Sequence, residues 1–496
     1  MTERLDHLAW LGVGAIWLSP TMPSPNLDWG YDVSDYYGVH PDLGTLDDLD
    51  RLVAEARRQG IDVLLDLVPN HTSDRHPWFQ EARASRTSPR RDWYVWADPG
   101  PGGAPPNNWL DPTGRPAWTL DEATGQCYLH NFLPEQPDLN WWNPEVRDEF
   151  DRILAFWFQR GVAGFRIDVA DGIVKDRELR DNPPAGADAT PMERRLGLAN
   201  RFSRHRPEVH DVHRHWRRLA DSWDPPRLLV GETVTADPEQ WAGYYGVGDE
   251  LHLALNFAFM FAPFAARPLA RAIDRSLALL PTGGRAAWAA SNHDVSRFPT
   301  RWAGGREPWA RLALVLLLTL RGVPVLYQGD EIAAQDVPVP DERIQDGFGK
   351  PGSVRYPGRD AARTPMQWEP GPGAGFSPVG VEPWLPIGDA DRRSVAAQRA
   401  DRDSTLHLCR DLVRLRSELP DLRDGEQVTV HLDDASWAYR RGAGLTVALN
   451  FGEEVHTVPG VAGDVVLGTD RSREGSRTAG SLQLAPGEGA IVRNIG

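Results

Sequence analysis

Short apolar runs alternate with amphipathic stretches along the first two thirds of the chain. Residues 15–18 and 61–68 are apolar runs of strand length, and the apolar positions between them have helical spacing. Thr45 and Asp48 match a capping box at the start of this helical segment, and Gly60 is a stop signal at its end. A strand, a helix and a second strand at this spacing predict a βαβ unit, in which the two strands are parallel.

The same alternation continues along the chain and predicts a parallel α/β barrel. Further strands are expected at 162–169, 228–230, 286–290 and 323–327, and helices at 144–159, at 309–320 and from Ser404. The stretch 72–137 interrupts this pattern and is rich in Pro, Gly, Asn, Asp and Trp, which predicts a loop-rich subdomain. Short β-rich runs from about residue 425 predict a small antiparallel domain. Because active sites of such barrels lie at the carboxyl ends of the strands, polar residues after each strand are candidate site residues.

Composition and charge limit the classes of function. The chain has 496 residues, of which 41% are hydrophobic and 25% charged, as in ordinary globular proteins, and its length allows more than one domain. The net charge of −16 disfavours binding to nucleic acid or to anionic membranes. The longest apolar stretch, 312–320, is too short to cross a bilayer, and the first residues lack a signal-peptide pattern. With only two cysteines as well, we expect a cytoplasmic protein with free thiols.

Four of the predicted strands end in segments with ionisable or amide side chains. These segments are Asn70-His71, Gly164 to Asp168, Gly231-Glu232 and Asn292 to Asp294. Arg166 and Asp168 alternate with apolar residues, so they share one face of their strand. A neighbouring arginine keeps a carboxylate ionised, and an ionised carboxylate in a pocket can attack the anomeric carbon of a sugar. Taken alone, this pair is explained equally well as a structural ion pair.

The other strand ends add a proton donor and hydrogen-bonding groups. Glu232 follows an apolar strand, where desolvation raises the pKa of a carboxyl group and suits it to donate a proton. His71, His293 and Asp294 offer hydrogen bonds to sugar hydroxyls, and the Asp294 carboxylate can stabilise positive charge. Each residue alone also has a structural explanation, but the joint pattern predicts one polar pocket for glycoside cleavage. A retaining mechanism needs its two working carboxyl groups about 5–5.5 Å apart.

Several longer segments carry a resemblance to a known family. They are 28–36 (DWGYDVSDY), 70–73 (NHTS), 136–141 (QPDLNW), 164–168 (GFRID), 292–294 (NHD), 327–331 (YQGDE), 359–360 (RD) and 363–368 (RTPMQW). In these segments the chain resembles the α-amylase superfamily of glycoside hydrolases, family 13, and specifically its α-glucosidase and oligo-1,6-glucosidase branch. The resemblance runs from about residue 5 into the C-terminal β domain.

The resemblance implies the domain organisation. It implies a (β/α)8 TIM barrel formed by 1–72 and 138–420, with an inserted loop-rich subdomain at 73–137 after the third strand and a C-terminal antiparallel β domain at 421–496. Family members normally begin with a further stretch that supplies the first barrel strand and an acidic metal-binding loop. Here Met1 falls inside the first expected helix. The first strand is therefore expected to be missing, and no metal or other cofactor is expected.

The resemblance also implies the catalytic roles. Asp168 would be the nucleophile that forms a β-glucosyl-enzyme intermediate, and Arg166 would orient it. Glu232 would protonate the leaving oxygen and then activate water. Asp294 would bind ring hydroxyls and favour the distorted transition state.

Further residues are implied to bind the glucose unit. His71 and His293 would bind its hydroxyls. Asp28 and Tyr31 match a pair that closes the non-reducing end of the site, with Tyr31 as a stacking platform. A closed end favours removal of one terminal glucose over cleavage within a long chain. The pocket wall would also include Phe132 and Arg363.

Two positions beside the expected nucleophile concern specificity. Val169 resembles the members that prefer α-1,6 linkages, whereas 168–170 and 291–295 also resemble actinobacterial α-glucosidases that act on maltose. Asp171 stands where related sequences often carry histidine, and this change would alter the binding of the leaving sugar.

The predicted function is a retaining α-glucosidase that releases terminal α-D-glucose from small α-glucoside oligosaccharides such as maltose. One alternative is an oligo-1,6-glucosidase acting on isomaltose-type substrates. Another is a transglucosylase or isomerase, such as a trehalose synthase, because it would use the same carboxylates. A non-catalytic binding relative is disfavoured, since all three carboxylates are present and no membrane segment is predicted. The sequence gives no indication of an oligomeric state.

Overall fold

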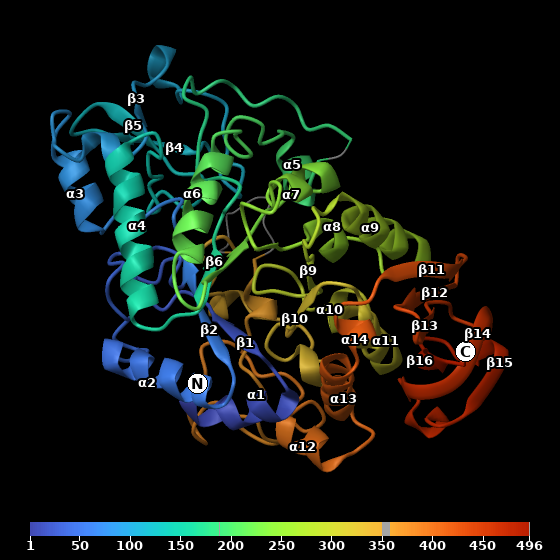
Figure 1. Cartoon of the computed structure of the whole chain (residues 1–496). Coiled ribbons are helices and arrows are strands. Elements are labelled where there is room, and N and C mark those ends of the chain that lie inside the picture. The colour runs from blue at the N-terminus through green and yellow to red at the C-terminus, as the bar shows by residue number, and fades with distance from the viewer. Residues whose placement is uncertain (188, 350–357, 496) are drawn as a thin grey trace.

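The computed structural model describes residues 1–187, 189–349 and 358–495, and a parallel sheet lies at its centre (Figure 1). Its strands are β1 (Ala15–Leu18), β2 (Asp62–Leu67), β6 (Gly164–Ile167), β7 (Leu228–Gly231), β8 (Leu253–Ala254), β9 (Ala287–Ala289) and β10 (Val323–Val325). The first five pair in this order, and a parallel bridge between Leu255 and Ala287 leads on to β9 and β10. Parallel strands that pair in sequence order are typical of an α/β barrel.

The parallel strands do not form a closed ring of pairings in the described residues. Within residues 1–187, 189–349 and 358–495, no pairing joins β10 back to β1. The side chains of these two strands are partly buried or exposed, whereas those of β6 are buried throughout. The central parallel sheet agrees with the predicted fold class, and the expected absence of a first barrel strand stays a prediction.

Side chains of the parallel strands alternate between two environments. One set of alternate positions packs together inside the barrel and includes Leu64, Val230, Leu253, Leu255, Ala287 and Ala289. The positions between them, such as Leu65, Phe165 and Leu229, belong to the core shared with the helices. Asp66 and Glu232 lie two residues after Leu64 and Val230, so they face the same interior nearer the carboxyl ends of the strands. The barrel interior is therefore apolar at one end and polar at the other.

Helices connect the strands and cover the sheet. The longer ones are α2 (Leu46–Arg58), α4 (Pro144–Gln159), α6 (Val209–Asp221), α9 (Ala266–Leu279), α11 (Glu307–Thr319) and α13 (Thr405–Glu418). The shorter ones are α1 (Leu5–Leu11), α3 (Pro77–Ala84), α5 (Pro191–Leu196), α7 (Pro238–Gly243), α8 (Phe257–Met260), α10 (Phe298–Arg301), α12 (Val395–Ala400) and α14 (Pro420–Arg423). The predicted capping box is confirmed, because the Thr45 side chain accepts the Asp48 N–H and the Asp48 carboxylate accepts the Thr45 N–H. The predicted bounds of α4 are also confirmed.

Helix α11 is the most apolar helix because it is covered on two sides. Its residues from Trp309 to Thr319 are all buried. It packs against α13 and against two strands of the C-terminal sheet, β13 (Leu445–Asn450) and β16 (Gly489–Asn494). A helix without a solvent-facing side has no need of a polar face. In the part of the chain that the structure describes, no helix combines the length and apolar character needed to cross a membrane.

Two antiparallel sheets flank the parallel one, as Figure 1 shows. The first is formed by residues that lie between β2 and β6 in the sequence. It has the order β3-β5-β4, with β3 (Trp96–Ala97), β4 (Trp118–Asp121) and β5 (Gln126–Leu129). The C-terminal sheet has the order β11-β12-β13-β16-β14-β15, with β11 (Gln427–Leu432), β12 (Ser436–Arg441), β14 (His456–Gly468) and β15 (Arg477–Leu484). The C-terminal antiparallel sheet agrees with the predicted fold class. The exact domain boundaries and the cytoplasmic location stay predictions.

Candidate active site

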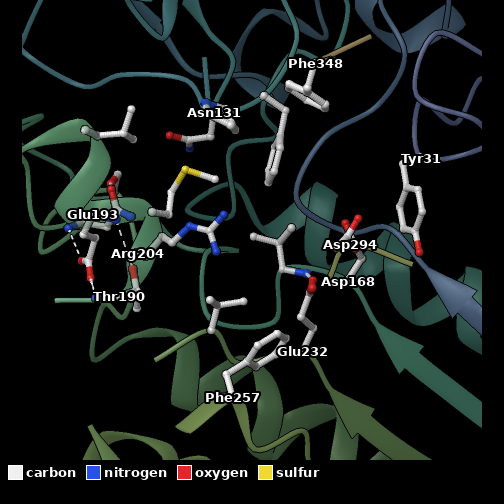
Figure 2. A pocket seen from close by; sticks show the side chains of 18 of the residues that line it. Tyr31, Asn131, Asp168, Thr190, Glu193, Arg204, Glu232, Phe257, Asp294 and Phe348 are labelled. Atoms are coloured by element: carbon white, nitrogen blue, oxygen red, sulfur yellow. Dashed lines mark hydrogen bonds between the residues drawn. The ribbon is translucent and has the colours of Figure 1, made fainter. Parts of the chain in front are cut away.

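A pocket of about 210 Å³ opens at the carboxyl ends of the parallel strands (Figure 2). Eight of the ten predicted site residues line it, namely Asp28, Tyr31, His71, Phe132, Asp168, Glu232, His293 and Asp294. The remaining two, Arg166 and Arg363, lie behind the wall in contact with Asp168 and Asp294, respectively. The structure therefore brings all ten predicted residues to one site, although they come from strand ends and loops far apart in the sequence.

Arg166 is buried behind the pocket and contacts three carboxyl groups. Its Nη1 donates to Asp168 Oδ1 at 2.6 Å and to the two Asp66 oxygens at 3.0 and 3.1 Å. Its Nη2 lies 2.9 Å from Glu232 Oε2. Asp168 and Glu232 are therefore held by two nitrogens of one guanidinium group, which keeps their carboxyl groups close together. Asp66 is not among the predicted site residues, because it lies within an otherwise apolar strand.

The three carboxyl groups share this cation in a nearly dry environment. Asp66, Asp168 and Glu232 are 1%, 6% and 7% exposed. Burial raises the pKa of Asp66 to about 6, although Arg166 lowers it. Burial also raises the pKa of Asp168 well above its ordinary value; Arg166 opposes this shift, and Glu232 and Asp66 add to it. The raised pKa values of Asp66 and Asp168 follow from three buried carboxyl groups that share one cation.

Asp294 lies in the opposite charge environment. Arg359 Nη1 and Arg363 Nη2 donate to Asp294 Oδ1 at 3.0 and 2.9 Å, and His293 Nε2 lies 3.3 Å from Oδ2. Burial alone would raise the pKa of Asp294, but the contacts with His293, Arg359 and Arg363 outweigh it and hold this pKa below its ordinary value. Asp294 is therefore ionised at all pH values at which Asp168 titrates.

Arg359 lies in the pocket wall and bridges two carboxylates. Its Nη2 donates to Asp28 Oδ1 at 2.6 Å while its Nη1 binds Asp294, so the side chain links two carboxylates that both line the pocket. Gln136 Nε2 donates to the other Asp28 oxygen at 3.1 Å. Asp346 holds the guanidinium from behind at 2.8 Å. Arg359 is not among the predicted site residues, although it belongs to a segment that carries the family resemblance.

Aromatic rings form another part of the pocket wall. The Tyr31 hydroxyl donates to Asp66 Oδ2 at 2.9 Å and lies 2.8 Å from His293 Nε2, and the two rings stack at a centroid distance of 5.3 Å. His71 Nε2 donates to the Tyr31 carbonyl at 2.9 Å, and its ring centroid lies 5.2 Å from that of Phe132. Burial lowers the pKa of His71, and it lowers the pKa of His293 to about 3. Both imidazoles are therefore neutral hydrogen-bonding groups near neutral pH.

The other side of the pocket is more apolar and includes Arg204. Leu110, Pro112, Met192, Leu196 and Val234 line it. Arg204 lines it too, and its Nη1 lies 3.3 Å from Asp171 Oδ1. Asp171 is fully buried, contacts His205 Nε2 at 3.3 Å and also accepts the Val234 N–H at 3.2 Å. Asp171 therefore acts on this side of the pocket by holding Arg204.

Val169 connects the two catalytic candidates through an unusual backbone conformation. Its φ is +46°, in the left-handed region that β-branched residues rarely adopt. Its N–H donates to Glu232 Oε2 at 2.9 Å. A Cβ atom at Gly172 would come within 2.7 Å of Val169 Cγ1, so this turn requires glycine there. Backbone strain of this kind is typical of functional sites, where the surrounding structure maintains it.

Comparison with known proteins identifies the family. Residues 1–425 match the family described as the α-amylase catalytic domain. The chain belongs to the α-amylase family. Residues 423–492 of this family member match a second family, described as a domain of unknown function, which covers the C-terminal sheet.

Individual relatives place this α-amylase family member among glycoside hydrolases of the α-glucosidase type. "Probable alpha-glucosidase" of Rhizobium meliloti (strain 1021) is 43% identical over 439 residues, which cover 86% of this chain and 79% of that protein. "Oligo-1,6-glucosidase" of Parageobacillus thermoglucosidasius is 34% identical over 493 residues, which cover 91% of this chain and 85% of that protein. The predicted resemblance to the α-glucosidase and oligo-1,6-glucosidase branch is thereby confirmed.

Solved structures of relatives share the whole fold. The α-glucosyl transfer enzyme XgtA has a TM-score of 0.91 at 36% identity, with 100% of this chain and 94% of that chain covered. The trehalulose synthase MutB from Pseudomonas mesoacidophila MX-45 has a TM-score of 0.88 at 30% identity, with 99% and 94% covered. A variant of MutB has been solved in complex with its substrate sucrose. The relatives of this family member thus include enzymes that act on α-glucoside sugars.

Proposed function

We propose that this chain is a retaining α-glucosidase that releases terminal α-D-glucose from short α-glucosides such as maltose. The observation that carries the proposal is that Asp168 and Glu232, both in the pocket wall, are bound to one guanidinium group. Retaining glycosidases use two carboxyl groups about 5–5.5 Å apart, whereas inverting enzymes need about 6.5–9.5 Å to admit water. Two carboxyl groups held by adjacent nitrogens of Arg166 support the shorter separation.

In the first step, Asp168 acts as nucleophile and Glu232 as acid. An ionised Asp168 oxygen forms a bond to the anomeric carbon while the bond from that carbon to the leaving oxygen breaks. Glu232 gives its proton to the leaving oxygen, so the products are a β-glucosyl ester of Asp168 and a free alcohol. This step needs one proton on the Asp168 and Glu232 pair, and the crowding of three buried carboxyl groups around one cation favours such a proton.

In the second step, Glu232 acts as base. It takes a proton from water as the water oxygen bonds to the anomeric carbon and the ester oxygen of Asp168 leaves. Glucose departs with the α configuration, and both carboxyl groups regain their starting protonation states. Arg166 stays paired with Asp66 throughout, so the guanidinium is never left without a counter-ion when Asp168 is esterified.

The remaining polar residues favour a single glucose unit with positive charge at its anomeric centre. Asp294 stays ionised, so it stabilises the oxocarbenium-like transition state. The ion pair between Arg359 and Asp28 closes the end of the pocket, which leaves room for a terminal unit but not for a continuing chain. The neutral His71 and His293 are suited to bind glucose hydroxyls, and the Tyr31 ring offers a flat apolar face to the sugar.

Glucosyl transfer is a second candidate function. It would proceed through the same intermediate, with a hydroxyl group of an acceptor in place of water. The similarity to XgtA over the full chain favours this candidate, and so do the apolar side chains of Met192, Leu196 and Val234, which could bind an acceptor and exclude water.

A preference for α-1,6 linkages is supported by Val169 and by the oligo-1,6-glucosidase relative.

Product analysis on maltose, isomaltose and sucrose tests the proposal. We expect glucose as the main early product, released faster from maltose than from isomaltose. Maltotetraose should yield only glucose and maltotriose at early times, because the closed end excludes internal cleavage. Faster release from isomaltose would assign the α-1,6 preference, and isomers or trisaccharides as main products would assign transfer. If none of these substrates is converted, the proposed function is wrong.

Substitution of Asp66 should shift the pH dependence of kcat/KM. A nucleophilic carboxylate loses activity as the pH falls through its pKa, and the negative charge of Asp66 contributes to the raised pKa of Asp168. In Asp66→Asn we therefore expect the acidic limb on maltose to move to lower pH. Asp274→Asn is the matched control, because burial raises the pKa of Asp274 too, but this residue lies on α9 and does not line the pocket. If the acidic limb of the kcat/KM profile is unchanged in Asp66→Asn, the pKa of Asp168 does not determine that limb.

A further inference from the structure

Three possible metal ligands converge where β11 and β14 of the C-terminal sheet approach each other. His431 lies near the end of β11, Asp433 in the turn to β12, and His456 at the start of β14. Both His431 Nε2 and His456 Nε2 contact the same oxygen, Asp433 Oδ2, at 3.0 and 2.9 Å. The three ligand atoms lie within 4.8 Å of one another. In the described part of the chain, no other group of three His, Cys, Asp or Glu side chains meets this condition.

The turn fixes the central carboxylate independently of the histidines. Asp433 Oδ1 accepts the N–H of Ala435 at 3.0 Å, and the N–H and hydroxyl of Ser436 at 2.7 and 3.1 Å. Oδ2 is therefore a fixed anionic oxygen that faces two imidazoles.

We propose that His431, Asp433 and His456 bind one divalent transition-metal ion, of which zinc is the best fit. Two imidazole nitrogens and one carboxylate oxygen are ligands typical of zinc and its first-row neighbours, whereas calcium and magnesium prefer oxygen ligands alone. Binding replaces the two Nε2–H donors with Nε2 lone pairs and releases any excess protons to water. One or two waters would complete the coordination, since the three side chains are 20%, 33% and 34% exposed.

The two contacts with Asp433 Oδ2 require only a small adjustment to bind an ion. Two ligands of a tetrahedral zinc ion at about 2.0–2.1 Å lie roughly 3.3 Å from each other. The two histidine contacts with Asp433 Oδ2 are a few tenths of an ångström shorter. Partly exposed imidazoles can rotate by this amount without disturbing the core. The Ser436 hydroxyl, which lies 3.1 Å from His431 Nε2, can retain its bond to Asp433 Oδ1.

A bound ion would connect parts of the sheet that do not pair. In the strand order, β11 and β14 are separated by β12, β13 and β16. The ion would join the β11–β12 turn to the first residue of β14, and an ion that binds only the folded state stabilises that state. None of the three residues lines the catalytic pocket, so this site is independent of the proposed glucosidase function.

Zinc titration of the full chain, without a histidine tag and after treatment with chelator, tests the proposal. Calorimetry with zinc chloride should show one saturable site per chain, and zinc should raise the thermal unfolding midpoint while calcium should not. Cobalt(II) should give the visible absorption of a low-coordinate nitrogen and oxygen site. His431→Ala and His456→Ala should each weaken zinc binding by at least about tenfold.

His215→Ala is the matched control, because His215 is an exposed histidine that contacts a single carboxylate, Asp151, at 2.7 Å. Its zinc affinity should equal that of the wild type. Circular dichroism in chelator should show that all variants are folded; if one is not, the cobalt spectrum and the stoichiometry of the wild-type chain decide. No saturable uptake by the wild type at millimolar zinc, or unchanged zinc affinity in folded His431→Ala and His456→Ala, would overturn the proposal.

Discussion

Replacing Asp168 by alanine should lower kcat on maltose by about four orders of magnitude or more, while the protein stays folded. Without the carboxylate, no covalent intermediate forms, and only binding and the charge stabilisation by Asp294 remain. The free energy of unfolding of Asp168→Ala should equal or exceed that of the wild type. In the wild type, three buried carboxyl groups compete for one guanidinium group, and in the variant Asp66 and Glu232 remain to neutralise Arg166.

Steady-state kinetics and the thermal unfolding midpoint of Asp168→Ala check both parts of this expectation. Asp211→Ala is a suitable control, since Asp211 is an exposed carboxylate on α6 that pairs with Arg214. It should keep the wild-type kcat. A kcat within tenfold of the wild type in Asp168→Ala would exclude Asp168 as the nucleophile, whatever the stability.

The loss of activity in Glu232→Gln should be larger for a leaving group with a higher pKa. With maltose, whose leaving group is a sugar alcohol, kcat should fall by roughly 10²–10⁴-fold, because no acid protonates the departing oxygen. With 4-nitrophenyl α-glucoside, the leaving phenolate needs little protonation, so formation of the glucosyl-enzyme should be much less affected. Glutamine keeps the volume of the side chain, and its carbonyl oxygen can still accept the Val169 N–H.

Comparison of the two substrates in Glu232→Gln is therefore the informative measurement. Pre-steady-state release of nitrophenol should exceed the steady-state rate, because hydrolysis of the intermediate also needs Glu232 as base. Glu239→Gln, an exposed carboxyl group at the start of α7, serves as the control and should behave like the wild type. Equal losses in the rate of glucosyl-enzyme formation on both substrates would mean that Glu232 acts in binding and not in proton transfer.

Much of the barrel could be predicted from local patterns because those patterns are strong. The capping box at Thr45 marks the start of α2, and Asn143 before Pro144 marks the start of α4, where its side chain caps the helix. Strand β8 could not be predicted, because it consists of Leu253 and Ala254 alone and is defined by its pairing with β7. A strand of two residues has no periodicity, so it is visible only in the folded protein.

The residues of the candidate site likewise divide into those that local sequence patterns predict and those that they do not. Asp168, Glu232 and Asp294 follow readable strands, so the rule that barrel sites lie at strand ends was enough to find them. Asp66 was missed because its only signal is a charged residue on the inward face of an apolar strand. Arg359 was missed because its partner Asp28 is 331 positions away, and no local pattern reports such a contact. His431 and His456 of the C-terminal cluster, which β12 and β13 separate in the sequence, were missed for the same reason.

Trapping the covalent intermediate tests the central claim most directly. The wild-type enzyme would be incubated with 5-fluoro-α-D-glucosyl fluoride, whose intermediate forms faster than it hydrolyses, and its peptides would then be analysed by mass spectrometry. The account predicts loss of activity together with one fluoroglucosyl group on the peptide that contains Asp168, attached to the Asp168 carboxyl oxygen. A group attached to another carboxylate, or turnover without any covalent adduct, would contradict the assignment of Asp168 as the nucleophile of a retaining enzyme.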